Sequence, residues 1–394
     1  MITSALSSSG APPRMTYARA RLFLGISGVG TSVLIASALL FWHVPARTLS
    51  NSGAQSLPEA VASLLLILLI GVAGLFTYDL LGGAIVVRDR APVSVFLARW
   101  LRGVTVQLFV WTVSATALTL AARVGGTIAI VLVFVALQFA LAALRAPLMR
   151  AIATFRSVPV TDRLRRIAER AGIAAERIDV LASTDEGFVG GWSGIAPRRL
   201  VLPARWLELP DDALVAALQR RRIIAESGAH LRGVLGAITW NTVGLVFVLA
   251  FTGAVIGTAA GMLTLAAGMT LWAFLGVLLL PTPSRAAVLA VDAAAAREVG
   301  ATVVQDAIEQ LDRWQDDEPK RSVRVETIFH PVPSRFAREA NLAAAPQQGV
   351  VTGDHAHHVA RHALWLGWAT LSPISRAVHC NVGRPALWAM LPGD

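Results

Sequence analysis

The feature that most constrains the fold is a succession of apolar runs, each about 18 residues or longer, which is long enough to cross a hydrocarbon core about 30 Å thick. Charged residues make up only 15% of the 394 residues and hydrophobic residues 55%. A soluble globular chain carries about 25% charged residues. The composition therefore excludes a soluble protein of two or three domains and predicts a polytopic membrane protein.

The arginines predict how the chain is oriented in the bilayer. They gather in residues 1–21, in residues 88–103 and after residue 145, whereas the opposite loops hold only Arg47 and Arg123. Arginine-rich loops stay on the cytoplasmic side, so both termini are expected there, in a multi-pass protein of the plasma membrane. The first apolar run has no small-residue cleavage site after it and is interpreted as an anchor. Six spans are expected, at about 22–42, 60–80, 104–122, 127–144, 234–252 and 254–280.

The polar segments between and after these runs predict a small α+β unit, so the fold class is mainly α. Pro210, Asp211 and Asp212 are a strong helix start, and Gly172 is a helix stop. Between two short strands lies the glycine-rich segment FVGGWSG, expected to be a hairpin or loop. The expected helices cover 160–171, 211–231, 285–300 and 302–314, and the expected strands cover 178–182 and 200–202. The chain then divides into a cytoplasmic segment 1–21, a four-helix membrane region 22–146, a cytoplasmic part 147–232, a membrane hairpin 233–280 and cytoplasmic helices with a tail 281–394.

Charge and cysteine content exclude several kinds of function. The net charge of +10 comes almost entirely from arginines beside apolar runs, which indicates retention at a bilayer and not nucleic-acid binding. One cysteine, Cys380, allows neither an internal disulfide framework nor an all-cysteine metal site. Its sequence neighbour His379 does not make it a nucleophile, because such a pair needs spatial adjacency, so Cys380 is interpreted as structural. The segment ALWLGWATL is too short to span. Three tryptophans are expected to pack the tail against the membrane face: Trp365, Trp368 and Trp388.

Several motifs, in order over roughly residues 15–340, resemble one family. They are FTYDLLGGAIVVRDRAPVSVFLARWLRG between early spans, GFVGGWSGIAPRRLVLPARWLELPDDALVAAL as a strand pair and helix start, PSRAAVLAVDAAAAREVG after a span pair, and FHPVPSRFARE, which is similar to T-H-P-x-x-x-R. Together they resemble the membrane-embedded zinc metalloproteases of metallopeptidase family 48, which includes CAAX prenyl proteases and HtpX-type proteases. The resemblance implies a gluzincin-like cytoplasmic domain.

The same resemblance implies where the zinc chemistry should lie. The family places H-E-x-x-H on a helix, where the two histidines bind one zinc ion and the glutamate is the general base; a glutamate on a later helix is the third ligand. In this chain Arg220 and Ile224 stand at the histidine positions and Arg221 at the base. Val288 stands where the third ligand should be, while Asp292 still matches an acidic residue of the family.

These substitutions predict the loss of catalysis. A guanidinium group stays protonated and has no lone pair to offer a cation, and isoleucine and valine offer none either. No zinc or other cofactor is expected, and the chain is interpreted as a pseudoprotease, a non-catalytic membrane protein that binds or scaffolds a partner. Without a metal, Asp292 is expected to form a salt bridge with Arg220 or Arg221 that joins the two helices. Alternatively, Arg220, Arg221 and Arg222 could form a solvated basic face.

An active metalloendopeptidase with displaced zinc ligands is the alternative function. His358 and His362 have i, i+4 spacing and follow Asp354 and His355, so a zinc site could form there; a solvated helix start capped by Asp354 is the competing interpretation. Glu226 and His230 could also join Asp292 around a metal, although their register is wrong for the family.

Two further residues match the family, and the composition indicates the expected partners. His330 and Arg335 match the late motif and are kept as a possible residual site with Asp292, with Arg335 expected to pair with a carboxylate or cap a helix. The expected partners are the lipid bilayer and a membrane protein or peptide, which could add to an exposed strand near 189–193 and 199–202. A transporter or channel is disfavoured, because no charged residues were expected within the spans.

Overall fold

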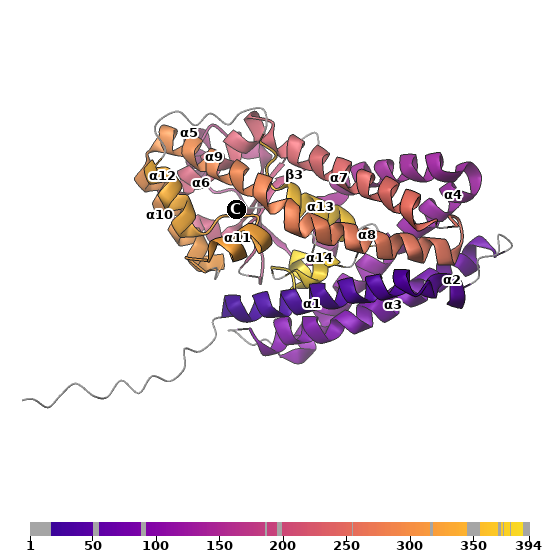
Figure 1. Ribbon diagram of the computed structural model, residues 1–394. Helices are drawn as coiled ribbons and strands as arrows, with labels where there is room; N and C mark the ends of the chain where they lie inside the picture. The colour runs from indigo at the N-terminus through magenta and orange to yellow at the C-terminus, as the bar shows by residue number, and fades with distance from the viewer. Residues whose placement is uncertain are drawn as a thin grey trace, which may run out of the picture.

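The computed structural model describes residues 17–49, 55–87, 92–185, 187–194, 199–253, 255–315, 318–344, 355–368, 372, 374–378 and 380–388. Within these residues, five helical stretches are long and apolar enough to cross a membrane. Figure 1 shows them running side by side at one end of the molecule, with the polar unit at the other. Their helices are α1 (Tyr17–Phe41), α3 (Leu57–Leu80, continued by a π-helical turn Leu81–Ile85), α4 (Val93–Ile152), α7 (Ala229–Thr252) and α8 (Ala259–Leu279). A short helix, α2 (Val44–Thr48), follows α1.

Helix α4 is a hairpin of two arms. Gly126, at its midpoint, has φ 61° and ψ −144°, a backbone conformation that is essentially restricted to glycine. The Arg102 side chain donates from Nε to the carbonyl oxygen of Ala151 at 2.6 Å and from an Nη to that of Arg150 at 3.4 Å. The two arms therefore lie antiparallel. They contain the two separate apolar runs predicted at 104–122 and 127–144.

The apolar helices bury one face and expose the other. Trp111, Ile130 and Phe134 on α4 are almost fully buried. Large apolar side chains on the outer surface, such as Leu34 at 71% and Ile128 at 75%, are exposed. Apolar exposure on this scale is what a bilayer would cover. The protein is an integral membrane protein.

The polar unit is built on a four-stranded sheet in the order β1–β2–β4–β3. Strands β2 (Ile178–Ala182) and β4 (Arg199–Pro203) are parallel and contain the two predicted strands. A further strand, β1 (Arg156–Val158), was not predicted and is antiparallel to β2. Part of the expected hairpin or loop forms a strand, β3 (Gly191–Ser193), antiparallel to β4.

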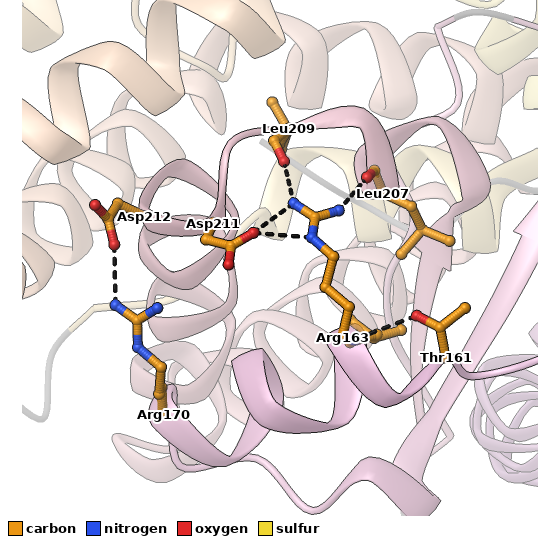
Figure 2. Close-up of polar contacts among 8 residues, drawn as sticks. Thr161, Arg163, Arg170, Leu207, Leu209, Asp211 and Asp212 are labelled. Atoms are coloured by element: carbon orange, nitrogen blue, oxygen red, sulfur yellow. Dashed lines mark hydrogen bonds and ion pairs between the residues drawn. The ribbon is translucent and has the colours of Figure 1, made fainter.

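Helix α5 (Asp162–Arg170) fixes the start of α6 (Asp211–Glu226), as Figure 2 shows. Arg163 donates to Asp211 at 2.8 Å and to two backbone carbonyls of the preceding turn, while Arg170 pairs with Asp212 at 2.9 Å. The prediction that α6 begins at this proline and two aspartates is confirmed. However, the two carboxylates bind arginines of α5, and the N-cap residue, Pro210, has no side-chain hydrogen bond to a helix N–H.

The expectation of one helix over 211–231 is wrong at its end. Helix α6 ends at Glu226, and Gly228 has a φ of 72°, a left-handed conformation that glycine adopts without steric cost. Helix α7 begins at the next residue. Because the two helices are separated by this turn, Glu226 and His230 are not an i, i+4 pair on one helix.

In the described part of the chain, six α-helices follow the last apolar one. Helix α9 (Pro281–Val299) begins four residues earlier than expected and continues directly from α8, and α10 (Ala301–Gln315) matches its prediction within a residue. The described residues beyond the last expected helix, 302–314, contain four more α-helices: α11 (Val323–Phe329), α12 (Arg335–Ala344), α13 (Val359–Trp368) and α14 (Ile374–Ala377). In Figure 1, α9 to α12 cover the polar unit.

The described residues between 355 and 388 lie among the apolar helices. Helix α13 contacts α4, α7 and α8, and α14 contacts α1 and α8 (Figure 1). Trp111 of α4 donates from Nε1 to the carbonyl oxygen of Trp368 at 2.7 Å. Trp365, Trp368 and Trp388 are 3%, 0% and 2% exposed. They pack inside the helical bundle and not against the membrane face, because α13 inserts between the long helices.

A buried ion pair anchors this segment to a span. Arg376 of α14 donates to Asp79 of α3, which also accepts hydrogen bonds from Trp100 Nε1 and the Gly383 backbone N–H, each at 3.0 Å. Asp79 is 2% and Arg376 1% exposed. Asp79 lies inside the predicted span 60–80, so the expectation that the spans contain no charged residue is wrong; the arginine 297 positions later supplies the counter-charge.

Candidate functional site

Helices α6 and α9 bring Arg220 and Asp292 into contact. Arg220 Nε lies 2.7 Å from Asp292 Oδ1, and the two residues are 1% and 0% exposed. Most of the neighbouring surface of both helices is apolar and packs into one core with α10, so the ion pair is closed off from water. Arg220, at the first histidine position of the family motif, therefore contacts the acidic residue of the later helix, and the predicted salt bridge is present.

A second arginine, which the sequence analysis missed, completes the site. Arg338 of α12 donates from Nε to Asp292 Oδ2 at 2.7 Å and from an Nη to Oδ1 at 2.8 Å. This fork-like contact is among the stronger forms of arginine–carboxylate pairing. Arg338 is 6% exposed. The signal that could have found it is its place in FHPVPSRFARE, one helical turn after Arg335.

The side chains at the other three motif positions are buried. Arg221 is 1% exposed; its guanidinium lies 5.3 Å from the centre of the Trp206 ring and donates to the Val189 carbonyl oxygen at 3.4 Å. Ile224 and Val288 are 1% and 0% exposed within the apolar core. Arg220 and Arg221 are buried, so the alternative of a solvated basic face is wrong for them. Arg222 is half-buried and pairs with Glu298 of α9.

The two arginines around Asp292 disfavour the binding of a metal ion at this position. Both oxygens of Asp292 are occupied by guanidinium groups, and a divalent cation placed there would be repelled by Arg220 and Arg338. Across the described ranges, no group of three or more His, Cys, Asp or Glu side chains is placed to hold a metal ion. The site is therefore a buried ion cluster that joins three helices.

His330 and Arg335 do not contact Asp292 directly. Arg335 pairs with Glu309 of α10 at 3.0 Å and with Glu339 at 3.4 Å, as expected of a residue that binds a carboxylate. His330 follows α11 and is 8% exposed. Burial, followed by the charges of Arg321, Arg361 and Arg285, lowers the pKa of its imidazole to about 3.

The histidines of the alternative zinc site lie elsewhere in the molecule. His358 and His362 are buried, and His362 Nδ1 lies 3.1 Å from an Nη of Arg145. This positive charge opposes a cation at the same place. His355 is half-buried and accepts a hydrogen bond at its carbonyl oxygen from Arg232 at 3.0 Å, whereas Asp354 lies outside the described residues.

The second proposed group, Glu226, His230 and Asp292, is not assembled. The Glu226 side chain is exposed and lies 3.7 Å from Arg222. His230 is buried beside His362, with ring centres 5.4 Å apart. Cys380 is half-buried, and His379 lies outside the described residues, so their pairing has no structural description here.

The strand expected to receive a peptide is covered. β3 is an edge strand, since it pairs only with β4 in the sheet. Its residues are buried, with Trp192 and Ser193 each 6% exposed, and Trp192 Nε1 donates to the Arg221 carbonyl oxygen at 2.7 Å. The expected exposed strand at 189–193 is therefore wrong, because this segment packs on α4 and α6.

The chain was compared with known protein families, sequences and structures. No protein-family model and no curated protein sequence matches the chain. A solved structure does match: the crystal structure of S. mikatae Ste24p, with a TM-score of 0.61 and 14% sequence identity, over 83% of this chain and 86% of that one. The fold is similar to that of Ste24p. At 14% identity this likeness concerns the fold alone.

Proposed function

We propose that this protein is an integral membrane pseudoprotease, a non-catalytic relative of membrane zinc metallopeptidases that acts as a binding or scaffold protein. The observation that carries the proposal is the Asp292 cluster: two guanidinium groups hold the acidic residue of the later helix, and one of them stands at a metal-ligand position of the motif. Two further observations support it: the fold is similar to that of Ste24p, and the residues at the four motif positions, Arg220, Arg221, Ile224 and Val288, offer no lone pair to a zinc ion.

The first test measures metal and peptidase activity in the same preparation. The full chain, purified in mild detergent without chelators and dialysed against zinc, is expected to retain far less than one zinc per chain and to cleave no peptide above the rate of a blank. Metal content is measured by mass spectrometry. Stoichiometric zinc that is lost in His358→Ala or His362→Ala would establish the alternative, an active metallopeptidase with displaced ligands, and overturn the proposal.

A binding role also needs a surface that a partner can reach. A cavity of about 160 Å³ lies where α11 meets α1 and α13, and His330 and Arg361 line it. We propose that a membrane protein or peptide binds at this opening, in place of the covered strand. A photo-crosslinking residue at Phe329, which lines the cavity, should capture the partner in native membranes, and one at exposed Arg324 on the same helix should not. Equal capture at both positions would contradict the proposal.

A further inference from the structure

A second, larger cavity lies where the apolar helices end. Its volume is about 470 Å³. The lining comes from both ends of the α4 hairpin, from the end of α3 with its π-helical turn, from the start of α1 and from the polar unit. Residues from these elements include Arg21, Val87, Phe96, Arg99, Arg102 and Ile152. The cavity is thus bounded by the ends of the spans that carry Arg21, Arg99 and Arg102.

The lining of this cavity is strongly basic. Among the described lining residues there are five arginines and one acidic side chain, Asp185. Arg384 donates to Asp185, with Nε at 3.0 Å, and Arg313 pairs with Glu309 outside the cavity. Arg102 donates from Nε and one Nη to backbone carbonyl oxygens. Because carbonyl groups are neutral, these hydrogen bonds do not cancel its positive charge. Arg99 is exposed. The cavity therefore holds an excess of positive charge.

Part of the wall between these arginines is apolar. Phe96 and Ile152 of α4 and Trp314 of α10 line the same cavity. An inorganic anion would use the guanidinium groups and leave these walls unused. An amphiphile with a phosphate headgroup would use both, because guanidinium groups bind phosphate oxygens in pairs and the acyl or glycerol part would cover the apolar walls.

We propose that this cavity binds the phosphate headgroup of an acidic phospholipid, with Arg99 and Arg102 as phosphate ligands. Basic pockets between membrane helices on the cytoplasmic side commonly hold such headgroups. The site is separate from the Asp292 cluster, and the proposal does not depend on whether the protein is a protease or a pseudoprotease.

The test compares three soluble probes with the full chain in detergent: dioctanoyl phosphatidylglycerol, dioctanoyl phosphatidylcholine and glycerol 1-phosphate. Affinities are measured by native mass spectrometry and by the ligand-dependent shift in melting temperature. Phosphatidylglycerol should bind at least about tenfold more tightly than phosphatidylcholine, since each arginine near a headgroup contributes on the order of 1 kcal/mol. Glycerol 1-phosphate should bind more weakly than phosphatidylglycerol, because it lacks the acyl chains.

Variants assign the binding to this cavity. Arg99→Gln with Arg102→Gln should lower the affinity for phosphatidylglycerol on the order of tenfold or more. Arg47→Gln with Arg166→Gln removes the same charge at two exposed arginines that do not line the cavity and should leave the affinity unchanged. Because Arg102 also supports the hairpin, Arg99→Gln and Arg99→Lys are tested alone; the first should weaken binding and the second should retain most of it.

Three outcomes would overturn the proposal. Equal affinities for the two lipids would show that no phosphate-selective site for acidic lipid exists. Equal losses in the cavity and control variants would place the binding elsewhere. Glycerol 1-phosphate binding as tightly as phosphatidylglycerol would identify a soluble phosphate ester, and not a lipid, as the ligand.

Discussion

Arg338 holds Asp292 through two nitrogens, Nε at 2.7 Å from Oδ2 and an Nη at 2.8 Å from Oδ1. Arg220 contacts the same carboxylate from α6. One aspartate thus joins α6, α9 and α12, and three formal charges are buried together. Clusters of this kind are costly to break, because each remaining charge is left in a medium of low dielectric constant.

Asp292→Ala is expected to lower the free energy of unfolding by about 3–5 kcal/mol, since Arg220 and Arg338 lose their carboxylate. Denaturant or thermal unfolding in detergent measures the change. Asp306→Ala on α10 is the control, because that aspartate is exposed, and it should change stability by less than about 0.5 kcal/mol. If both variants unfold alike, the cluster does not support the fold.

Replacing all three residues of the cluster with apolar residues should restore stability that Asp292→Ala loses. Asp292→Leu combined with Arg220→Leu and Arg338→Met is expected to be more stable than Asp292→Ala, because an apolar set of similar volume has no desolvation penalty. The same unfolding experiment compares the two. A triple variant less stable than the single one would indicate that packing, and not charge, dominates at this position.

Restoring the motif tests which positions correspond to zinc ligands. Arg220→His, Arg221→Glu, Ile224→His and Val288→Glu together recreate H-E-x-x-H and the third ligand, so this variant should bind about one zinc per chain. Metal analysis after dialysis measures it. The matched control keeps Ile224 and changes the other three residues, and it should lose most of the zinc. Absence of zinc from the full set would contradict the assignment of these positions.

His330 should make stability depend on pH. Its pKa is about 3 in the folded protein, lowered first by burial and then by Arg321, Arg361 and Arg285, against about 6.5 in the unfolded chain. Between these pH values only the unfolded state binds the proton. The free energy of unfolding therefore has its full value above pH 6.5 and falls as the pH decreases, by up to about 1.4 kcal/mol per pH unit.

His330→Gln should flatten this decrease. Melting temperatures at pH 7 and pH 5 are compared for the parent and the variant, and the parent should lose more on acidification. His43→Asn, at an exposed histidine between α1 and α2, is the control and should behave as the parent does. Identical pH profiles for His330→Gln and the parent would show that other groups cause any acid sensitivity.

Gly126 should be required for the α4 hairpin. Its backbone, with φ 61° and ψ −144°, is strained for any residue with a side chain, so Gly126→Ala is expected to cost about 1–3 kcal/mol. Gly71→Ala in α3 is the control: a methyl group there would meet no atom within 4 Å, and the helical backbone favours alanine. Unfolding in detergent separates the two, and equal stability would contradict the role of Gly126.

The ion pair between Asp79 and Arg376 should hold the C-terminal segment in place. Arg376→Gln leaves Asp79 buried without that guanidinium, so residues 355–388 should become cleavable by protease in detergent. Arg324→Gln, at an exposed arginine, should stay resistant. Adding Asp79→Asn to Arg376→Gln removes the second charge and should recover part of the resistance; no recovery would indicate that the charge itself is not the cause.

Much of the helical framework follows from local sequence pattern. The apolar runs predict the long helices, and Pro210 with two aspartates predicts the start of α6. Even the Arg220–Asp292 contact could be inferred, because the family resemblance aligned their helices and the chemistry required a counter-charge. These features depend on residues close in sequence or on a known motif order.

The features that sequence reasoning missed depend on contacts between distant segments. Arg338 reaches Asp292 only because α12 packs on α9, and Asp79 is paired by a residue 297 positions later. The three-residue strands β1 and β3 are too short to show an alternating pattern. The position of α13 inside the bundle also has no local signal, since a ten-residue apolar helix looks the same at a surface or in a core.

The packing of residues 355–388 between the long helices has a consequence for how the protein is made. A ribosome releases these residues after all five apolar helices, so the bundle cannot close around them until they have been made. Until then Asp79 would remain inside a half-assembled protein without its arginine. Closure of the bundle must therefore follow the synthesis of Arg376, and a chain stopped before that residue would keep a carboxylate among its apolar helices without the counter-charge.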